Sequence, residues 1–294
     1  MGFFDGVHIG HAALLEKAKE RAKEIGAKPA VLSFDTHPDK LVFRTEIRLL
    51  SDTKERESII RRCFGIEDTV FIHFDRETMN LPWQEFADRI IRSLGAKWFV
   101  VGHDFTFGRK GEGTAEKLKA YCAERGIGCD IIRPVCLDGR IVSSTYIRTL
   151  IECGEMPEAA RYLGRPFSLT GSVRSGSHLG RTLGAPTINM YFPPESVVPK
   201  LGVYAAKAVL PGEEEHIAVT NVGVRPTVSE EGEVSVETYL LDYEGDLYGV
   251  PVRVEFYRYL RPEIRFDTVE ELSIQIRKDG DAARAFFREK KEGQ

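Results

Sequence analysis

Short apolar runs alternate with segments of helical periodicity through the first half of the chain. The strand-like runs cover residues 30–34, 69–74 and 98–102. The helix-like segments cover residues 53–64, 82–94, 113–126, 145–153 and 156–163, and Pro82 suits the first position of its helix. Uninterrupted apolar runs are typical of strands buried in a parallel sheet. The alternation therefore predicts the doubly wound, Rossmann-like α/β fold of a nucleotide-binding domain.

A period of two replaces this pattern after Gly164-Arg165-Pro166. The alternating segments cover residues 203–209, 234–240 and 252–257. Short strands between Gly and Pro turns predict a small antiparallel β-barrel. An amphipathic helix at about 268–290 is expected to pack on the barrel. We therefore expect two domains, at 1–165 and 166–294.

The composition is that of a soluble globular protein, with 42% hydrophobic and 29% charged residues. A length of 294 residues is enough for two domains with cores of their own. The net charge of −4 argues against a nucleic-acid partner, because proteins that bind nucleic acid are usually basic. No apolar run approaches the ~18 residues of a membrane span. Composition does not decide the oligomeric state, so a homo-oligomer stays open.

The cysteines number five, and no two of them form a CxxC motif. An odd count without that motif favours neither a disulfide framework nor a zinc site. No signal peptide precedes the first motif of the chain. The cysteines are therefore expected to be free thiols in a reducing cytoplasm.

Residues 2–11, GFFDGVHIGH, hold the first candidate chemistry. His8 and His11 lie three apart with Gly10 between them, at the start of a helical pattern. The apolar positions of that pattern are Leu14, Leu15, Ala18, Ala22 and Ile25. Two imidazoles and free N–H groups at a positive helix N-terminus form a suitable binding site for phosphate. The alternative is a Gly/His turn that only caps a surface helix.

Three further segments each follow a predicted strand, at the sheet edge where such folds bind ligands. They are Ser33–Pro38 (SFDTHP), the Gly-rich loop Gly102–Gly113, and Ser143–Arg148 (SSTYIR). The last places hydroxyl groups at a helix start, with Arg148 one turn further on. Taken alone, His37-Pro38 could be a simple turn and SSTYIR a simple helix cap.

A second candidate site lies in Gly184–Asn189, GAPTIN, after Gly-rich segments near 171–176 and 180–181. Thr187 and Asn189 are two apart on an extended segment, so their side chains point to the same side. A hydroxyl and an amide oxygen are hard ligands suited to Mg²⁺. The alternative is a polar turn before the next strand.

His8-Ile9-Gly10-His11 is the signature of the HIGH nucleotidyltransferase superfamily, which also includes class I aminoacyl-tRNA synthetases. With the three segments above, the first half resembles the adenylyltransferase half of bacterial bifunctional riboflavin kinase/FAD synthetases. Residues 166–288 resemble the riboflavin kinase barrel, through the segments 184–189, 199–204, 221–227, 236–238, 246–249 and 261–266. A synthetase is the weaker alternative, because the chain has no KMSKS-like loop and no room for a tRNA-binding domain.

The resemblance implies that ATP and Mg²⁺ convert riboflavin to FMN at the barrel, and that a second ATP adenylylates FMN to FAD at the first domain. It implies catalytic roles for Glu237, His8, His11 and Arg148, and metal ligation by Thr187 and Asn189. The residues it implies for ATP or flavin binding are Gly2, Phe4, Asp5, Gly6, Gly10, His37, Pro38, Asp104, Phe105, Gly108, Ser144, Thr145, Gly171, Gly176, Gly180, Arg181, Gly184, Pro186, Tyr204, Asn221 and Arg261.

The chemistry of the two reactions agrees with these residue types. The phosphate of FMN is already ionised, so adenylyl transfer needs positive charge and hydrogen-bond donors rather than a base. The terminal hydroxyl of riboflavin holds its proton tightly, so its phosphorylation calls for a carboxylate base. Glu237 suits that role, because its neighbours Val236 and Thr238 face the other way. The alternative is an ordinary exposed strand glutamate.

One departure from the family concerns the first strand of the sheet. The family has a strand immediately before the glycine turn, whereas this sequence begins at Met1-Gly2. We therefore expect that strand to be absent and the turn that carries His8 to be less firmly held. Two functional alternatives stay open: a riboflavin kinase with an impaired adenylyltransferase domain, and a non-catalytic flavin-binding regulator.

Overall fold

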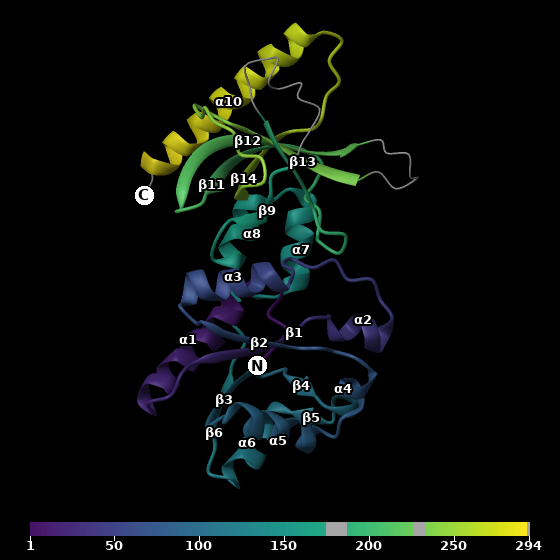
Figure 1. Ribbon diagram of the computed structural model, residues 1–294, viewed down its shortest axis with the longest axis vertical. Helices are drawn as coiled ribbons and strands as arrows, with labels where there is room; N and C mark the ends of the chain where they lie inside the picture. The colour runs from purple at the N-terminus through teal and green to yellow at the C-terminus, as the bar shows by residue number, and fades with distance from the viewer. Residues whose placement is uncertain (175–186, 226–232, 293–294) are drawn as a thin grey trace. The chain divides into compact units, whose positions relative to one another are not determined.

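The chain divides into two compact units, Met1–Ser144 and Thr145–Gln294, in a computed structural model that describes residues 1–174, 187–225 and 233–292 (Figure 1). Helices α7 (Ser144–Cys153) and α8 (Met156–Leu163) stand at the beginning of the second unit. The domain boundary predicted at 164–166 follows these two helices. Each unit is described below by itself.

Two separate pairs of parallel strands stand at the centre of the first unit. Strand β1 (Ala30–Phe34) pairs with β2 (Asp68–Ile72), and β3 (Trp98–Gly102) pairs with β6 (Gly128–Ile132). In the part of the chain that the structure describes, no strand joins the two pairs. The first residues bridge them instead: the α-amino group of Met1 donates to Val100 O at 2.8 Å, and Gly2 N donates to Leu32 O at 3.2 Å.

Helices accompany these strands, and the four longest of them bury apolar side chains in the core. The helices are α1 (Ile9–Glu24), α2 (Pro38–Phe43), α3 (Thr53–Phe64), α4 (Arg76–Asn80), α5 (Trp83–Leu94) and α6 (Ala115–Ala123). One core cluster contains residues of α5, α6 and β3, among them Phe86, Phe99 and Leu118. A second contains residues of α1, α3 and β1, among them Leu15 and Ile59. The unit also contains two one-turn helices, η1 (Asp5–Val7) and η2 (Arg109–Gly111). It contains two small hairpins as well: β4 (Thr106–Phe107) pairs with β5 (Gly113–Thr114), and β7 (Cys136–Leu137) pairs with β8 (Arg140–Ile141).

The helix ends follow local chemistry. The Asp52 carboxylate accepts from Glu55 N at 2.8 Å and caps α3, which ends at Gly65 with φ 65°. Pro82 is the residue before α5, so its predicted place as the first helical residue was wrong by one position. Strand β6 was not predicted, because a charged residue, Asp130, interrupts its apolar run. The Asp130 carboxylate lies within the fold because Arg21 Nε (2.7 Å) and Trp98 Nε1 (2.9 Å) donate to it.

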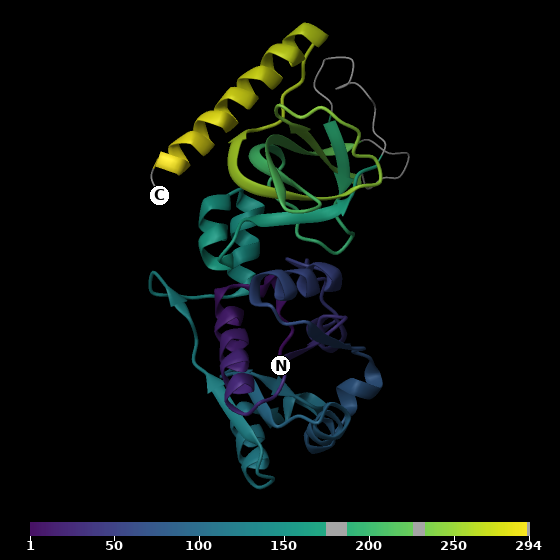
Figure 2. The ribbon, with the colours of Figure 1, turned by 60° about the vertical axis from the view of Figure 1, so that its left-hand side comes forward.

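The second unit is a curled antiparallel sheet, as Figure 2 shows. Among the described residues its strand order is β10-β13-β12-β11-β14-β9. The strands are β9 (Phe167–Ser172), β10 (Thr187–Tyr191), β11 (Gly202–Leu210), β12 (Glu214–Arg225), β13 (Glu233–Leu240) and β14 (Pro251–Arg261). Just beyond the end of edge strand β9, Arg174 forms one bridge with the other edge strand, β10, where its N–H donates to Asn189 O at 2.9 Å. The predicted antiparallel barrel is thereby confirmed.

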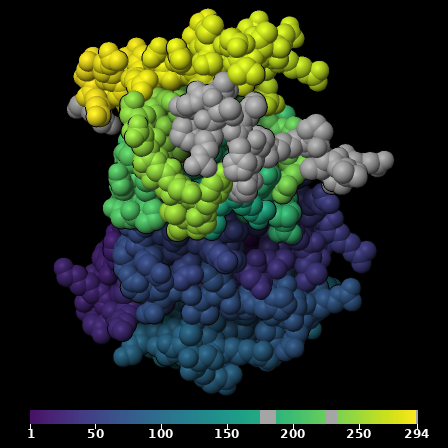
Figure 3. Space-filling view, turned by 45° about the horizontal axis from the view of Figure 1, so that its top comes forward, coloured from purple at the N-terminus to yellow at the C-terminus, as the bar shows by residue number. Residues whose placement is uncertain are grey.

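Helix α10 (Val269–Glu292) packs on the outer face of this sheet, close to its predicted bounds. Its Ala283 and Phe287 bury against Val203, Ala205 and Val219. Figure 3 shows the helix, in yellow, lying across the strands. The inside of the barrel is filled by other side chains of the same strands, for example Val236 and Phe256, both 0% exposed.

Candidate functional site

The turn before α1 has a strained backbone. Phe4, Gly6 and Val7 have φ values of 59°, 72° and 41°. Glycine tolerates this left-handed region, but a β-branched residue such as Val7 rarely enters it. Strain of this kind costs on the order of 1–3 kcal/mol per residue and persists only where surrounding contacts enforce it. The turn must therefore be held from several sides.

Hydrogen bonds from neighbouring segments hold this turn. The Asp5 carboxylate accepts from Leu50 N (2.9 Å) and Ser51 N (3.1 Å), and Ser51 Oγ accepts from Gly6 N at 2.9 Å. Ser144 Oγ, at the start of α7, donates to Asp5 O at 3.0 Å. Asp5 and Ser144, both implied by the resemblance as ligand-binding residues, therefore also fix the shape of the turn.

The two histidines of the turn lie together at the N-terminus of α1. His8 is the cap residue, and its Nδ1 accepts from His11 N at 3.2 Å. The rings stack with centroids 3.6 Å apart. A Cβ on Gly10 would lie 3.0 Å from the His8 ring, so the absence of a side chain at Gly10 leaves space for that ring. Because Nδ1 of His8 is an acceptor, the neutral ring carries its proton on Nε2.

Arg56 on α3 is a buried cation that the sequence did not reveal. It is 0% exposed, and its Nη1 donates to Phe3 O (2.6 Å) and to Ser33 Oγ (2.9 Å). Its guanidinium lies 4.2 Å from the Phe3 ring centroid, and burial lowers its pKa to about 10. The only signal in the sequence is its place three residues before the buried Ile59, on the apolar face of its helix. Arg56 anchors the segment that leads into the histidine turn.

Polar side chains gather where β1 and β2 end. His37 caps α2 by accepting from Asp39 N at 3.2 Å, and its ring lies 4.4 Å from that of Phe3. Asp35 contacts His73 Nδ1 at 2.7 Å. Burial raises the pKa of Asp35, but the bonds from His73 and the Phe74 N–H outweigh this and lower it; the same bond raises the pKa of His73. Sequence reasoning named His37 and Pro38 but missed the Asp35–His73 pair.

The Gly-rich loop after β3 is only partly available to a ligand. Asp104 is exposed, while the Phe105 ring stacks on Phe107 at 5.3 Å and packs against the core. Gly108 has φ 73°, and a Cβ there would lie 2.6 Å from Trp83 Cα, so this glycine serves close packing.

At the start of the second unit, Thr145 and Arg148 lie one turn apart on α7. Arg148 Nη1 donates to Thr145 Oγ1 at 3.4 Å. This places the predicted hydroxyl and guanidinium groups on one side of the first turns of the helix.

In the barrel, the predicted metal and base residues share one face of the sheet. Asn189 on β10 lies directly opposite Glu237 on β13, and Glu237 lies directly opposite Asn221 on β12. Thr187 is on the same side of β10, opposite Tyr239. Val236 and Thr238 point inward and are 0% exposed, so Glu237 and Tyr239 lie on the opposite face of β13.

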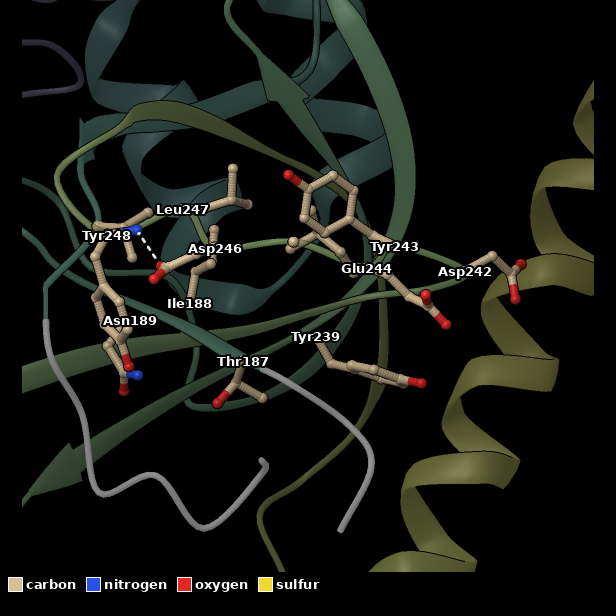
Figure 4. Close-up of a pocket in the computed structure, with 13 residues that line it drawn as sticks. Thr187, Ile188, Asn189, Tyr239, Asp242, Tyr243, Glu244, Asp246, Leu247 and Tyr248 are labelled. Atoms are coloured by element: carbon tan, nitrogen blue, oxygen red, sulfur yellow. Dashed lines mark hydrogen bonds between the residues drawn. The ribbon is translucent and has the colours of Figure 1, made fainter. Parts of the chain in front are cut away.

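A cavity of about 910 Å³ opens beside this row (Figure 4). Thr187 and Asn189 lie on one side of it, and the loop 242–248 provides much of the rest. The lining residues are Val173, Thr187, Ile188, Asn189, Tyr239, Leu240, Asp242, Tyr243, Glu244, Gly245, Asp246, Leu247 and Tyr248. The Asp246 carboxylate accepts from Tyr248 N at 3.0 Å and shapes the loop. Aromatic rings beside hard oxygen ligands suit a flat heterocycle joined to phosphates.

Three implied binding residues are engaged within the fold. Tyr204 is 0% exposed and its hydroxyl donates to Lys200 O; burial raises its pKa. The Arg261 guanidinium donates two hydrogen bonds to the Asp279 carboxylate on α10, from Nε to Oδ1 at 2.9 Å and from Nη2 to Oδ2 at 2.7 Å. Gly171 on β9 has Met190 Cε 3.3 Å from where a Cβ would stand. Gly176, Gly180, Arg181, Gly184 and Pro186 lie outside the described residues.

The described residues contain no group of three His, Cys, Asp or Glu side chains that could hold a metal ion by itself. A metal at Thr187 and Asn189 therefore needs phosphate oxygens to complete its shell, as Mg²⁺ often does. The five cysteines, all within the described residues, are free, as predicted. Within the described ranges no helix is both long and apolar enough to cross a membrane.

One unit is Rossmann-like and carries a histidine turn, and the other is a curled barrel with a Thr/Asn/Glu row. Together these features define a two-domain nucleotide-dependent transferase. Family models agree for each part: FAD synthetase matches residues 1–146, and riboflavin kinase matches residues 163–287. The curated bifunctional riboflavin kinase/FMN adenylyltransferases of Listeria monocytogenes and Escherichia coli are each 35% identical to this chain. Each match covers 98% of this chain and 91% of the relative.

A solved structure described as "Crystal Structure of Macrolide-efflux Protein from Streptococcus pneumoniae" matches with a TM-score of 0.84 at 31% identity. The match covers 97% of this chain and 92% of that one, so the whole fold is shared. The chain belongs to the bifunctional riboflavin kinase/FMN adenylyltransferase family.

Proposed function

We propose that this chain phosphorylates riboflavin to FMN at the barrel and adenylylates FMN to FAD at the first unit, using ATP for both reactions. The observation that carries the proposal is the row Asn189–Glu237–Asn221 on three adjacent strands beside a cavity that also reaches Thr187. A base flanked by hard oxygen ligands is what phosphoryl transfer to a hydroxyl needs.

At the barrel, Glu237 accepts the proton of the terminal ribityl hydroxyl as that oxygen attacks the γ-phosphorus of ATP. The P–O bond to ADP breaks, and ADP leaves with the bonding electron pair. Thr187 Oγ1 and Asn189 Oδ1 are the ligands for the divalent cation, which we propose is Mg²⁺. Bound there, the cation would neutralise phosphate charge. The cavity beside these ligands takes the adenine of ATP, with its rings against Tyr239 and Tyr248.

At the first unit, the phosphate of FMN attacks the α-phosphorus of ATP and pyrophosphate leaves. No base is needed, because the nucleophile is already ionised. His8 and His11 donate to the phosphates at the positive end of α1. The strained, firmly bonded turn keeps these donors in place before substrate arrives.

Product analysis tests both halves of the proposal. Purified protein is incubated with riboflavin, ATP and MgCl₂, and flavins are separated by chromatography. FMN followed by FAD is expected. FMN alone would mean a riboflavin kinase with an impaired adenylyltransferase, and bound but unchanged riboflavin would mean a flavin-binding regulator. Replacing MgCl₂ with CaCl₂ tests the choice of cation, with loss of FMN formation expected.

We further propose a cytoplasmic enzyme with no nucleic-acid or membrane partner. The free cysteines and the net charge of −4 support this. A homo-oligomer remains open, and sedimentation of the purified chain decides it.

A further inference from the structure

Arg174 lies in one row with the proposed metal ligand and the proposed base. It forms a bridge directly opposite Asn189, and Asn189 is directly opposite Glu237 on β13. Residues directly opposite each other in an antiparallel pair have their side chains on the same face of the sheet. The guanidinium, the metal ligand and the carboxylate therefore share one face, in the order Arg174, Asn189, Glu237.

The ring of Tyr191 supports the Arg174 side chain. Tyr191 is two residues after Asn189 on β10, so it lies on the same face of that strand. Arg174 Cζ is 5.3 Å from the centroid of the ring, within the range of a cation–π contact. An arginine stacked on an aromatic ring keeps its N–H groups at the rim of the planar guanidinium, where they can bind an anion.

No carboxylate of the described residues neutralises Arg174. Its side chain is exposed, and it forms no ion pair or hydrogen bond with another described residue. By contrast, Arg261 and Arg284 of the same unit are bound to Asp279 and Asp242. Toward the described part of the chain, Arg174 therefore keeps its charge and its N–H donors for a ligand.

The charge of the neighbouring cavity calls for a cation at this position. The described lining of the cavity includes three carboxylates and no lysine, arginine or histidine. A nucleoside triphosphate brings more negative charge than one divalent cation neutralises, so its phosphates need a further positive group. Arg174 follows the lining residue Val173 and is opposite the lining residue Asn189, which places this cation at the edge of the cavity.

The in-line course of phosphoryl transfer assigns Arg174 to the leaving group. The attacking oxygen and the leaving oxygen lie on opposite sides of the transferred phosphorus. The attacking hydroxyl is next to its base, Glu237, and the metal-bound phosphate is next to Asn189. Arg174 is on the other side of Asn189 from Glu237, so it stands on the side of the departing phosphate.

We propose that Arg174 binds the β-phosphate of ATP at the barrel and stabilises the charge that develops on ADP as it leaves. The inference rests on the proposed kinase function. When the hydroxyl oxygen attacks, the bond from the γ-phosphorus to the bridging oxygen breaks, ADP takes the bonding pair, and Glu237 takes the proton. A guanidinium can donate two N–H groups to one phosphate, and this contact strengthens as the charge on the phosphate grows.

The test measures FMN formation by the original protein, Arg174→Ala and Arg174→Lys, with ADP and AMP as inhibitors that compete with ATP. ADP has a β-phosphate and AMP lacks it. Arg258→Ala is the matched control, because Arg258 is also an exposed arginine over an aromatic ring. Its Cζ is 5.7 Å from the centroid of Phe286, but it lies on β14, outside the row. Adenylylation of added FMN is followed in the same samples.

Arg174→Ala should lower the kcat for FMN formation by about tenfold or more, the usual effect of losing a hydrogen bond to a charged group. The inhibition constant of ADP should rise by a similar factor. The inhibition constant of AMP, the KM for riboflavin and the rate of adenylylation should stay within about twofold. Arg174→Lys keeps the charge but loses the planar pair of donors, so it should lie between the two. Arg258→Ala should match the original protein.

Equal increases in the inhibition constants of ADP and AMP would overturn the inference, because Arg174 would then not act at the β-phosphate. A change confined to the KM for riboflavin would overturn it by assigning Arg174 to the acceptor, and unchanged kinetics of Arg174→Ala would do so as well. If Arg174→Ala has a lowered melting temperature, Arg174→Lys is judged by the same criteria.

A protein that forms no FMN would contradict the proposed function but would still allow a test of this inference. Calorimetric binding of ADP and of AMP in the presence of MgCl₂ then replaces the rates. Weaker binding of ADP alone by Arg174→Ala would support the inference, and equal effects on both nucleotides, or none, would overturn it.

Discussion

The rings of His8 and His11 stack face to face, with centroids 3.6 Å apart and planes 11° from parallel. The contact follows from their spacing, because His8 caps α1 and His11 begins its first turn. It is fixed by the bond from His11 N to His8 Nδ1 and by the absence of a side chain at Gly10. We propose that these two stacked rings at a helix N-terminus bind the phosphates of a nucleotide.

His11→Ala removes one member of this stack. FAD formation should fall on the order of 10²–10³-fold, the usual effect of losing one preorganised donor. FMN formation should stay within about twofold, because the proposed base and metal ligands lie in the other unit. Both rates are measured on one protein sample, so FMN formation serves as the internal control. Equal loss of both products would contradict separate sites.

Glu237→Gln keeps the shape of the side chain and removes the proposed base. The kcat for FMN formation should fall by roughly 10²–10⁴-fold, while adenylylation of added FMN continues. Glu233→Gln, four residues earlier on the same side of β13, is the control and should keep its activity. Near-normal turnover by Glu237→Gln would remove this residue from the mechanism.

Asn189→Ala removes one proposed metal ligand but keeps the backbone bridge that Asn189 O forms with Arg174 N. The concentration of Mg²⁺ that gives half-maximal FMN formation should rise several-fold, because one of two protein ligands is lost. Adenylylation of FMN should show the same Mg²⁺ dependence as before. A raised requirement in both reactions would show that the variant acts through the fold instead.

Local pattern predicted most of the fold, because strong apolar periodicity coincides with the elements. Strands β1 and β3 and helix α3 have the bounds that the pattern indicates. The pattern failed where a polar residue inside an element is satisfied by a distant partner. Strand β6 was missed because its charged residue Asp130 is stabilised by Arg21, which lies 109 positions away in the sequence. In the same way, the sequence did not show that Arg56 on α3 is buried and bonded to Phe3 O.

The site was predictable as motifs but not as contacts. The Thr187, Asn189 and Glu237 set was proposed from the resemblance to the riboflavin kinase family, together with residue types and alternation along single strands. The hydrogen bond from Asn221 Nδ2 to Glu263 Oε1 joins residues 42 apart, and the Asp35–His73 pair joins residues 38 apart. Strand register and sheet curvature bring such distant residues together, and neither can be predicted from a local sequence pattern. For the same reason, sequence alone did not reveal that Arg261 is held by Asp279.

The α-amino group of Met1 predicts a pH dependence of stability. Burial lowers its pKa from 8.0 to about 5. Between these values the unfolded chain holds a proton that the folded first unit has released, so the free energy of unfolding should rise with pH from 5 to 8. The melting temperature of the first unit is measured at pH 5.5 and 7.5. An Nα-acetylated protein should lose this rise, and an identical rise after acetylation would assign it to other groups.

The gap between the two strand pairs supports a final prediction about the first unit. A cavity of about 510 Å³ lies there, lined by apolar side chains that include Leu14, Val31, Leu32, Phe99 and Val100. A strand placed before Met1 would run between β1 and β3, pair with both, and join the two halves into one sheet. Because no strand of the described residues fills this gap, we expect the first unit to unfold at a lower temperature than the barrel and FAD formation to be slower than FMN formation. Adding about six apolar, β-branched residues before Met1, a typical strand length, should raise both the stability of that unit and FAD formation.

The control for this extension is a Gly/Ser segment of equal length, which adds chain without strand propensity or apolar surface. It should change neither quantity. His11→Ala in the protein with the apolar extension should abolish the gain in FAD formation, because the same turn carries the reaction. The argument fails if the chain as it stands makes FAD as fast as FMN and the apolar extension alters neither rate nor melting temperature. In that case Met1 and Gly2, through their bonds to Val100 O and Leu32 O, would be enough to hold the histidine turn.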